Sequence, residues 1–346
     1  MLNKIIAACA GMAALATCAT TAGAASISGA GATFPAPVYA KWAEAYKAQT
    51  GLLLNYQAIG SGGGIKQIEA KTVDFGASDK PLKPDVLAAD GLMQFPTVVG
   101  GVVPVVNLPG IAPGALRLTG PVLADIYRGA RAYWDDPVIK SFNPTVKLPH
   151  IKITVVHRSD GSGTSFLFTS YLSNNAPHWA KDVGANDAVN WPVGVGGKGN
   201  DGVAAMVKQT PGSIGYVEYA YAKQNHMTYA VMQNHAGRWV APTAGNFAAA
   251  AAGARWSAAP GYYLLLLDQP GASSWPITGA TFILMHLKQT NAQNAHDVLA
   301  FFDWAYKNGN PAAEQLDYVP LPDGVKALIR KSWLKIVGPN GQAVYK

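Results

Sequence analysis

The chain has 346 residues, of which 49% are hydrophobic, 10% aromatic and only 14% charged, and its formal net charge is +7. This composition excludes an intrinsically disordered chain, and the length allows two globular domains with their own cores. Lys and Arg do not form a block of five like charges, so a nucleic-acid-binding surface is not indicated. A moderate positive excess instead favours attraction of a small anion.

Residues 1–24 have the pattern of a secretory signal segment. A basic start with Lys4 precedes an apolar run over 5–21, and the small residues of 22–24 follow it. We therefore expect an exported protein that begins near Ala25.

Both cysteines, Cys9 and Cys18, lie in this segment, so the exported chain would carry no disulfide and no thiolate metal site. Lipidation at Cys18 is the alternative, although Thr17 stands where a smaller residue usually precedes a lipidated cysteine. Later in the chain, the densest apolar run, 262–267, is far shorter than a membrane span.

Apolar runs typical of strands alternate with stretches of helical spacing, and this alternation predicts an α/β fold. Strands are predicted over 52–58, 73–77, 98–107, 151–157 and 213–219, and helices over 35–49, 65–71, 164–172, 202–209, 294–307 and 325–334. The alanine-rich stretch 243–253 predicts a solvent-covered helix without a functional role.

Three turns of small residues each precede a predicted helix: GAGATFP at 29–35, GSGGG at 60–64 and RSDGSGT at 158–164. Free N–H groups at a helix start favour negative charge, and glycine lets a ligand approach the backbone. Thr33, near the expected N-cap, and Ser61 add hydroxyl groups, while Arg158 adds a guanidinium that Asp160 can hold. Each turn alone is also ordinary helix capping; facing one cleft, the three would form an oxyanion cage.

The stretch 194–199 has the G-x-G-x-x-G spacing of dinucleotide sites. Trp191-Pro192 interrupts the strand that should precede it, and Gly199 stands where a P-loop needs Ser or Thr. We expect a glycine-rich loop beside the cleft.

Other chemistries find little support in the sequence. No two histidines are four residues apart, so a zinc site is not indicated, and no Gly-x-Ser-x-Gly elbow is present. The aromatic residues Phe301, Phe302 and Trp304 are typical of core packing. We therefore expect no metal and no cofactor.

Nearly end to end, the chain resembles the periplasmic phosphate-binding proteins of bacterial high-affinity phosphate ABC transporters. The motifs that carry the resemblance are GAGATFPAPVY at 29–39, VDFGASD at 73–79, DGSGTSF at 160–166, GGKGNDG at 196–202 and FFDWAY at 301–306. The resemblance implies a type II periplasmic binding protein fold, with lobe 1 at 25–103 and 274–346 and lobe 2 at 104–273. Two segments would cross between the lobes, and phosphate would lie between them.

Carried over residue by residue, the resemblance implies that lobe closure surrounds phosphate with a defined set of groups. The contacts are Thr33, the N–H of Phe34, Ser61, Asp79, Arg158, Ser162, Gly163 and Thr164, and Asp160 pairs with the arginine. Gly62 departs from the family pattern, since a second serine is frequent there; the change would keep the backbone donor.

Asp79 is the contact that spacing alone would not have selected, because a carboxylate repels an anion. By itself it reads as an N-cap before Lys80-Pro81. The resemblance implies that it accepts a hydrogen bond from an oxyanion that still carries a proton, as phosphate does near neutral pH and sulfate does not.

The sequence therefore predicts a monomeric periplasmic receptor that delivers phosphate to a membrane permease and catalyses no reaction. The first alternative is a secreted phosphatase or phosphotransferase with Ser162 or Thr164 as nucleophile, for which no nearby base is evident in the sequence. The second is a receptor for sulfate or molybdate, which would need no acceptor at Asp79.

Overall fold

The computed structural model of the protein describes residues 25–346, and the expected signal segment 1–24 lies outside the described residues. The first half of the chain forms β1 (Ser26–Gly31), α1 (Ala36–Thr50), β2 (Leu53–Ala58), α2 (Ser61–Glu69), β3 (Phe75–Ser78), α3 (Pro84–Ala89), β4 (Leu92–Val106), β5 (Arg117–Leu118), α4 (Gly120–Tyr127), α5 (Pro137–Phe142), β6 (Thr154–Arg158), α6 (Gly163–Asn175) and α7 (Pro177–Asp182). The second half forms β7 (Val195–Gly197), α8 (Gly199–Gln209), β8 (Ser213–Glu218), α9 (Tyr219–Gln224), β9 (Thr228–Tyr229), β10 (Val231–Gln233), β11 (Trp239–Val240), α10 (Ala244–Ala251), β12 (Leu266–Leu267), β13 (Ile277–His286), α11 (Ala292–Asn308), α12 (Asn310–Gln315), β14 (Val319–Pro320) and α13 (Asp323–Trp333), with short 3-10 turns at Trp256–Ala258 and Pro260–Tyr262.

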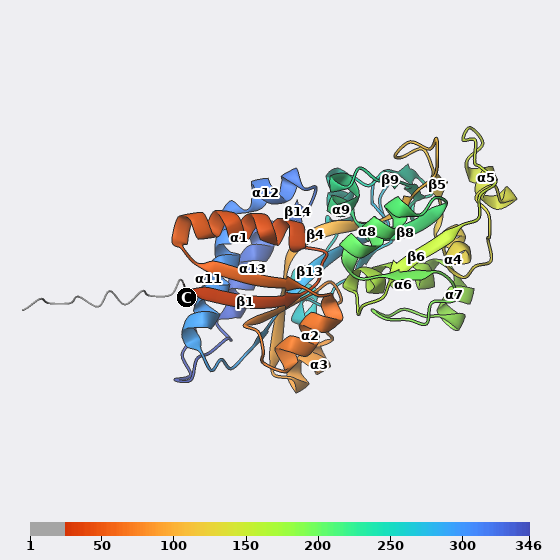
Figure 1. Ribbon diagram of the computed structural model, residues 1–346. Helices are drawn as coiled ribbons and strands as arrows, with labels where there is room; N and C mark the ends of the chain where they lie inside the picture. The colour runs from red at the N-terminus through yellow and green to blue at the C-terminus, as the bar shows by residue number, and fades with distance from the viewer. Residues whose placement is uncertain (1–24) are drawn as a thin grey trace, which may run out of the picture.

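A mixed sheet runs through the whole molecule in the order β2-β1-β3-β13-β4-β8-β6-β7, and β9, β12 and β14 pair onto its central strands. Figure 1 shows two lobes along this sheet. Lobe 1 is built around β1, β2 and β3 with α1, α2, α3, α11, α12 and α13, and lobe 2 around β6, β7 and β8 with α4 to α9. The mixed α/β architecture agrees with the predicted two-lobed fold.

Strand β4 connects the two lobes. Its 92–101 part pairs antiparallel with β13, and its 102–106 part pairs antiparallel with β8. All 15 residues of β4 are buried, which explains its largely apolar sequence without regular alternation: a strand covered on both faces needs no polar side chains on every second residue. Trp275, just before β13, donates from Nε1 to the carbonyl oxygen of Val102 at 3.0 Å and ties the two connecting segments together.

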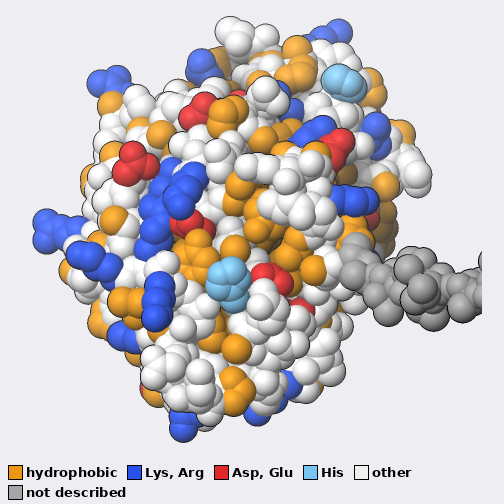
Figure 2. Space-filling model, turned by 90° about the vertical axis from the view of Figure 1, so that its left-hand side faces the viewer, with side chains coloured by type: hydrophobic (Ala, Val, Ile, Leu, Met, Phe, Trp, Pro, Cys, Tyr) orange, Lys and Arg blue, Asp and Glu red, His pale blue; other side chains and the backbone are white. Residues whose placement is uncertain are grey.

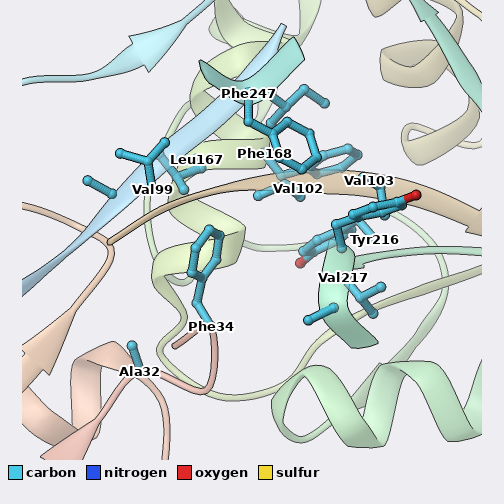
Figure 3. Close-up of a cluster of buried hydrophobic side chains, with 14 of the residues drawn as sticks. Ala32, Phe34, Val99, Val102, Val103, Leu167, Phe168, Tyr216, Val217 and Phe247 are labelled. Atoms are coloured by element: carbon cyan, nitrogen blue, oxygen red, sulfur yellow. The ribbon is translucent and has the colours of Figure 1, made fainter. Parts of the chain in front are cut away.

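The apolar core continues across the junction of the lobes. Figure 3 shows the ring of Phe34, from the first turn, pointing toward β4, with Phe168 of α6 and Phe247 of α10 around the same strand. A Cβ at Gly100 would lie 2.9 Å from the Phe34 ring, so the glycine makes room for it. Core packing thus fixes the turn that carries Phe34.

Five of the six predicted helices begin earlier than expected, and the differences are largest for α2 and α8. Helix α2 starts at Ser61 rather than at 65, and α8 starts at Gly199 rather than at 202, because their glycines form the first helical turn. Strand β13 was not predicted, although it lies next to β4 and only its last residue is not buried. Thr278, Gly279 and Thr281 interrupt the apolar residues of β13, so it shows neither a regular alternation nor a clear apolar run.

The other packing predictions are largely confirmed. Phe301 and Phe302 are fully buried in α11. The alanine-rich stretch forms α10, but Phe247 and Ala250 bury one side of it, so it is not simply covered by solvent. None of the helices within residues 25–346 combines the length and the apolarity needed to cross a bilayer. Figure 2 shows Lys and Arg spread over one end of the molecule and interrupted by neutral side chains.

Candidate functional site

The three predicted turns follow three strands of the one sheet. Strand β1 pairs parallel with both β2 and β3 in lobe 1, and β6 pairs parallel with both β7 and β8 in lobe 2. The turns leave β1, β2 and β6, and Asp79 follows β3 directly. In open α/β sheets, the carboxyl ends of parallel strands are where ligands bind.

The second and third turns touch each other across the lobes. The N–H of Gly62 donates to the carbonyl oxygen of Gly161 at 2.9 Å. Gly60 has a φ of +89°, and a Cβ there would lie 2.2 Å from Asp160 Oδ2, so only glycine fits. The backbone donor of Gly62 is thus kept, as expected, but it bonds the opposite lobe.

Ser61, Asp79 and Gly163 meet at one point. The Oγ of Ser61 accepts from the N–H of Asp79 at 3.1 Å and lies 3.5 Å from Asp79 Oδ2. A Cβ added to Gly163 would lie 2.5 Å from Ser61 Oγ and 2.7 Å from Asp79 Oδ2. The start of α6 in lobe 2 therefore lies directly against the serine and the carboxylate of lobe 1.

Arg158 is held in a fixed orientation by Asp160. Its Nε and Nη2 donate to the two carboxylate oxygens at 2.7 and 2.5 Å, and its Nη1 donates to Thr164 Oγ1 at 3.3 Å. The arginine side chain is only 1% exposed. This two-point pairing, suggested by the spacing of the two residues, is the geometry in which a guanidinium is aimed most rigidly.

Asn200, at the start of α8, connects the first and third turns. Its Nδ2 donates to Thr33 Oγ1 at 2.7 Å and to Thr164 Oγ1 at 3.4 Å, and its backbone N–H also donates to Thr33 Oγ1. Its Oδ1 accepts from the N–H of Glu218 at 2.9 Å. Sequence reasoning did not select Asn200 as a site residue; the only signal was its place within the matched motif at 196–202.

These contacts leave the hydroxyl groups of the site with protons to donate. Protein N–H groups already donate to the oxygens of Thr33, Ser162 and Thr164. Because a hydroxyl has a single proton, and no acceptor for it is found within residues 25–346, each can still donate one hydrogen bond. A site lined by such donors suits a guest rich in acceptor oxygens.

Backbone N–H groups add to the same donor set. Helix α6 has Ser162 as its N-cap, whose Oγ accepts from the N–H of Ser165 at 3.0 Å. The N–H groups of Gly163 and Thr164, in the first turn of the helix, and that of Phe34 have no protein acceptor in the described part of the chain. The start of a helix carries partial positive charge, so these donors favour an anion.

Asp79 is the one acidic group facing these donors, and its surroundings favour its protonated form. The side chain is 1% exposed, and burial raises the pKa of Asp79 to about 7, although bonds from Thr281 and Ser61 and the charge of Arg158 oppose the rise. Thr281 Oγ1 donates to Asp79 Oδ1 at 2.6 Å. Asp79 does not cap a helix as its bare sequence suggested, because α3 begins only at Pro84.

Asp160 shows the opposite shift. Burial alone would raise its pKa, but the hydrogen bonds and charge of Arg158, together with the N–H of Gly199 at 3.1 Å, outweigh that effect and lower the pKa of the Asp160 carboxyl. Its negative charge is neutralised by the arginine. The site thus contains one carboxylate paired with a cation and one held by hydroxyl groups.

The predicted residues are therefore brought together. Thr33, Ser61, Asp79, Arg158, Ser162, Gly163 and Thr164 all belong to one buried cluster, while Phe34 contributes only its backbone because its ring lies in the core. Thr33 does not cap α1 as expected, since Pro35 is the N-cap residue and no side chain bonds there. Its hydroxyl is instead held by Asn200.

The glycine-rich stretch 194–199 lies beside this cluster as predicted. Strand β7 pairs with β6, and the N–H of Gly199 donates to Asp160. His157, the histidine nearest to the third turn in sequence, bonds the carbonyl oxygen of Arg158 and stacks on Trp191. Within residues 25–346 no group of three or more His, Cys, Asp or Glu side chains is placed to hold a metal ion.

Comparison with known proteins identifies the family. Residues 16–308 match the PBP superfamily domain. The phosphate-binding protein PstS of Pasteurella multocida is 54% identical over 331 residues, which is 95% of this chain and 96% of that protein.

Solved structures share the fold at lower identity. A high-affinity periplasmic phosphate-binding protein bound with phosphate, PfluDING, superposes with a TM-score of 0.72 at 23% identity, covering 89% of this chain and 94% of its own. An ABC-type phosphate transport receptor from Vibrio cholerae gives a TM-score of 0.55 at 19% identity, covering 86% of this chain and all of its own. The chain therefore belongs to the PBP superfamily and, within it, to the family of PstS phosphate-binding proteins.

Proposed function

We propose that this protein binds inorganic phosphate between its lobes and delivers it to an ABC-type permease, without catalysing a reaction. The observation that carries the proposal is the donor set. Three hydroxyl groups whose oxygens already accept from the protein, free N–H groups at the start of α6 and one anchored guanidinium surround a single acidic acceptor. Phosphate with one remaining proton is complementary to that arrangement.

Each residue has a distinct part in this proposal. Thr33, Ser162 and Thr164 donate through their free hydroxyl groups, and Ser61 donates by turning its hydroxyl proton from Asp79 Oδ2, 3.5 Å away, to the phosphate. Phe34, Gly163 and Thr164 donate through their backbone N–H groups, and Arg158 supplies the positive charge. Asp160 holds the arginine. Asp79, in its ionised form, accepts a hydrogen bond from the protonated oxygen of phosphate, which distinguishes phosphate from sulfate or molybdate.

The wider setting follows from the family and the fold. We propose that lobe 1 comprises 25–103 and 274–346 and lobe 2 comprises 104–273, so that the chain crosses in β4 and again just before β13. The protein would act as a monomer in the periplasm after removal of 1–24, with a lipid anchor at Cys18 as the alternative. The affinity difference between open and closed lobes would drive capture of phosphate, and the permease would supply the energy for transport.

A phosphatase is the weaker candidate. Nucleophilic attack by Ser162 or Thr164 requires a base within hydrogen-bond reach. In the described structure the partners of these two hydroxyl oxygens are Ser165, Arg158 and Asn200, none of which is a base. The relatives compared above are named as binding or transport proteins rather than enzymes.

Calorimetry tests the proposal directly. Titration with phosphate should show one tight site per chain, arsenate should bind because it also keeps a proton, and sulfate should bind far more weakly. Incubation with a phosphomonoester should give no turnover. Equal affinity for sulfate and phosphate would remove the proposed role of Asp79, and sustained hydrolysis would favour the enzyme.

A further inference from the structure

Three tyrosines donate to three consecutive carbonyl groups of the first turn. Tyr56 from β2 bonds the carbonyl oxygen of Ala32, Tyr221 from α9 bonds that of Thr33, and Tyr318, just before β14, bonds that of Phe34, each at 2.6 Å. Of the three, Tyr221 is the one that comes from lobe 2, so its bond crosses between the lobes.

These carbonyl groups differ in the N–H group that shares their peptide unit. The carbonyl group of Thr33 and the N–H of Phe34 are two ends of one resonating peptide unit. A donor on the carbonyl oxygen withdraws electrons through that unit and makes its N–H a stronger donor. The carbonyl group of Phe34, in contrast, is joined to Pro35, which has no N–H.

We propose that Tyr221 is a positioning residue for phosphate: by bonding the carbonyl oxygen of Thr33 from the opposite lobe, it orients and strengthens the N–H of Phe34 as a donor to the anion. This inference rests on the proposed function. Because Tyr221 and Thr33 belong to different lobes, opening would break the bond, and the N–H would gain its full donor strength only as the lobes close around phosphate.

The surroundings of Tyr221 are consistent with this role. Its phenol is largely buried, and burial, followed by the charges of Glu218 and Asp201, raises its pKa, so the hydroxyl keeps the proton that it donates. Asn200 of lobe 2 also bonds the hydroxyl group of Thr33. Lobe 2 therefore holds Thr33 both at its carbonyl oxygen and at its side chain. At the other end of the same peptide unit, the N–H of Phe34 has no acceptor among residues 25–346.

The decisive experiment compares Tyr221→Phe with Tyr318→Phe. Both remove a 2.6 Å bond to neighbouring carbonyl groups of one turn, but only the first lies on the peptide that carries the N–H of Phe34. Tyr318 also bonds Glu218 Oε2 at 2.8 Å, which is another contact between the lobes. The control variant therefore also loses a bond that stabilises the closed form. Phosphate affinity is measured by calorimetry, and the amide proton of Phe34 is followed by NMR in phosphate-saturated, 15N-phenylalanine-labelled protein.

We expect Tyr221→Phe to weaken phosphate binding by roughly tenfold, as loss of one hydrogen bond allows, and to move the Phe34 amide proton upfield. Tyr318→Phe should leave that resonance near its wild-type position. An unchanged affinity in Tyr221→Phe, or a Phe34 amide that shifts equally in both variants, overturns the proposal.

A third variant covers the case in which Tyr221→Phe does not fold. Incorporation of 3-fluorotyrosine at 221 keeps the ring and makes the hydroxyl a stronger donor, so the Phe34 amide proton should move downfield and phosphate should bind more tightly. A shift in the other direction contradicts the inference. Failure of the wild-type protein to bind phosphate at all would instead contradict the proposed function, and that outcome is measured first.

Discussion

Asp79, which is buried, and Asp160, which is partly buried, reach one site from opposite lobes, and their surroundings shift the pKa values of the two carboxyl groups in opposite directions. Both oxygens of Asp160 accept from Arg158, and the pKa of this carboxyl is lowered. The oxygens of Asp79 are near the hydroxyl groups of Thr281 and Ser61, and burial raises its pKa to about 7.

The difference separates two tasks that one residue type can perform. A carboxylate matched by a guanidinium is electrically neutralised and serves to aim that cation. A buried carboxylate that is bonded only by neutral donors is destabilised by the loss of water, and no directly bonded cation offsets this. Such a carboxylate takes up a proton more readily. We infer that Asp160 fixes the cation of the site and Asp79 senses the proton of the guest.

Removing the arginine should have the largest effect on phosphate binding. Arg158→Ala deletes the cation and leaves the partly buried Asp160 without a compensating charge, so phosphate binding should weaken by on the order of a thousandfold and unfolding should require less denaturant. Calorimetry and urea titration measure the two effects.

Arg131→Ala is the matched control for this change. Arg131 is also paired with two carboxylates of lobe 2, Asp125 and Asp136, at 2.8 and 2.9 Å, but none of its hydrogen bonds involves the site. Its loss should reduce stability and spare phosphate affinity. Equal binding losses in the two variants would mean that general electrostatics, rather than the aimed guanidinium, holds the anion.

Asp79→Asn should change the preference of the site for phosphate over sulfate. The amide offers N–H donors that a carboxylate lacks, so sulfate gains a partner and phosphate loses one. We expect the ratio of phosphate to sulfate affinity to fall by about tenfold to a hundredfold, the value of one or two charge-assisted hydrogen bonds. Undiminished discrimination in competitive titrations would show that Asp79 does not set selectivity.

The same variant tests the raised pKa through stability of the ligand-free protein. Asp79 in the folded protein keeps a proton up to about pH 7, whereas the unfolded chain releases it near its ordinary value of 3.8. The folded state therefore holds more protons in this range, and its stability contribution, full below pH 3.8, is lost as pH rises toward 7, by up to roughly 1.4 kcal/mol per pH unit. Asp79→Asn should flatten this slope relative to the wild type, and parallel curves would contradict the assignment.

The smallest expected effect concerns the close approach of the two lobes. In Gly163→Ala, the new methyl group would meet Ser61 and Asp79 at 2.5 to 2.7 Å and would hold α6 away from lobe 1. Phosphate affinity should fall by roughly tenfold, while unfolding in urea changes little because alanine suits a helix. Gly324→Ala in α13, where a Cβ has no neighbour within 4 Å, is the control that should leave binding unchanged.

The local features of the site could be predicted because they follow from neighbours along the chain. Arg158 and Asp160 are only two positions apart in the chain, and their pairing is found at 2.5 and 2.7 Å. Strand β13 and the bridging role of Asn200 could not be predicted in the same way. In β13, Thr278, Gly279 and Thr281 interrupt the apolar residues, so no clear pattern marks the strand. Asn200 joins Thr33 and Thr164, which lie 167 and 36 residues from it in the chain.

The α/β alternation, the three small-residue turns, the arginine with an acid two residues later and the family resemblance carried by these motifs could all be read from the amino-acid sequence. The fold was needed to learn which protons remain free to donate, that Asp79 is buried against hydroxyl groups, and that Tyr221 reaches the first turn from the opposite lobe. The physical reason is that a residue type defines which hydrogen bonds are possible. Burial and partners brought from distant parts of the chain decide which of them are already made.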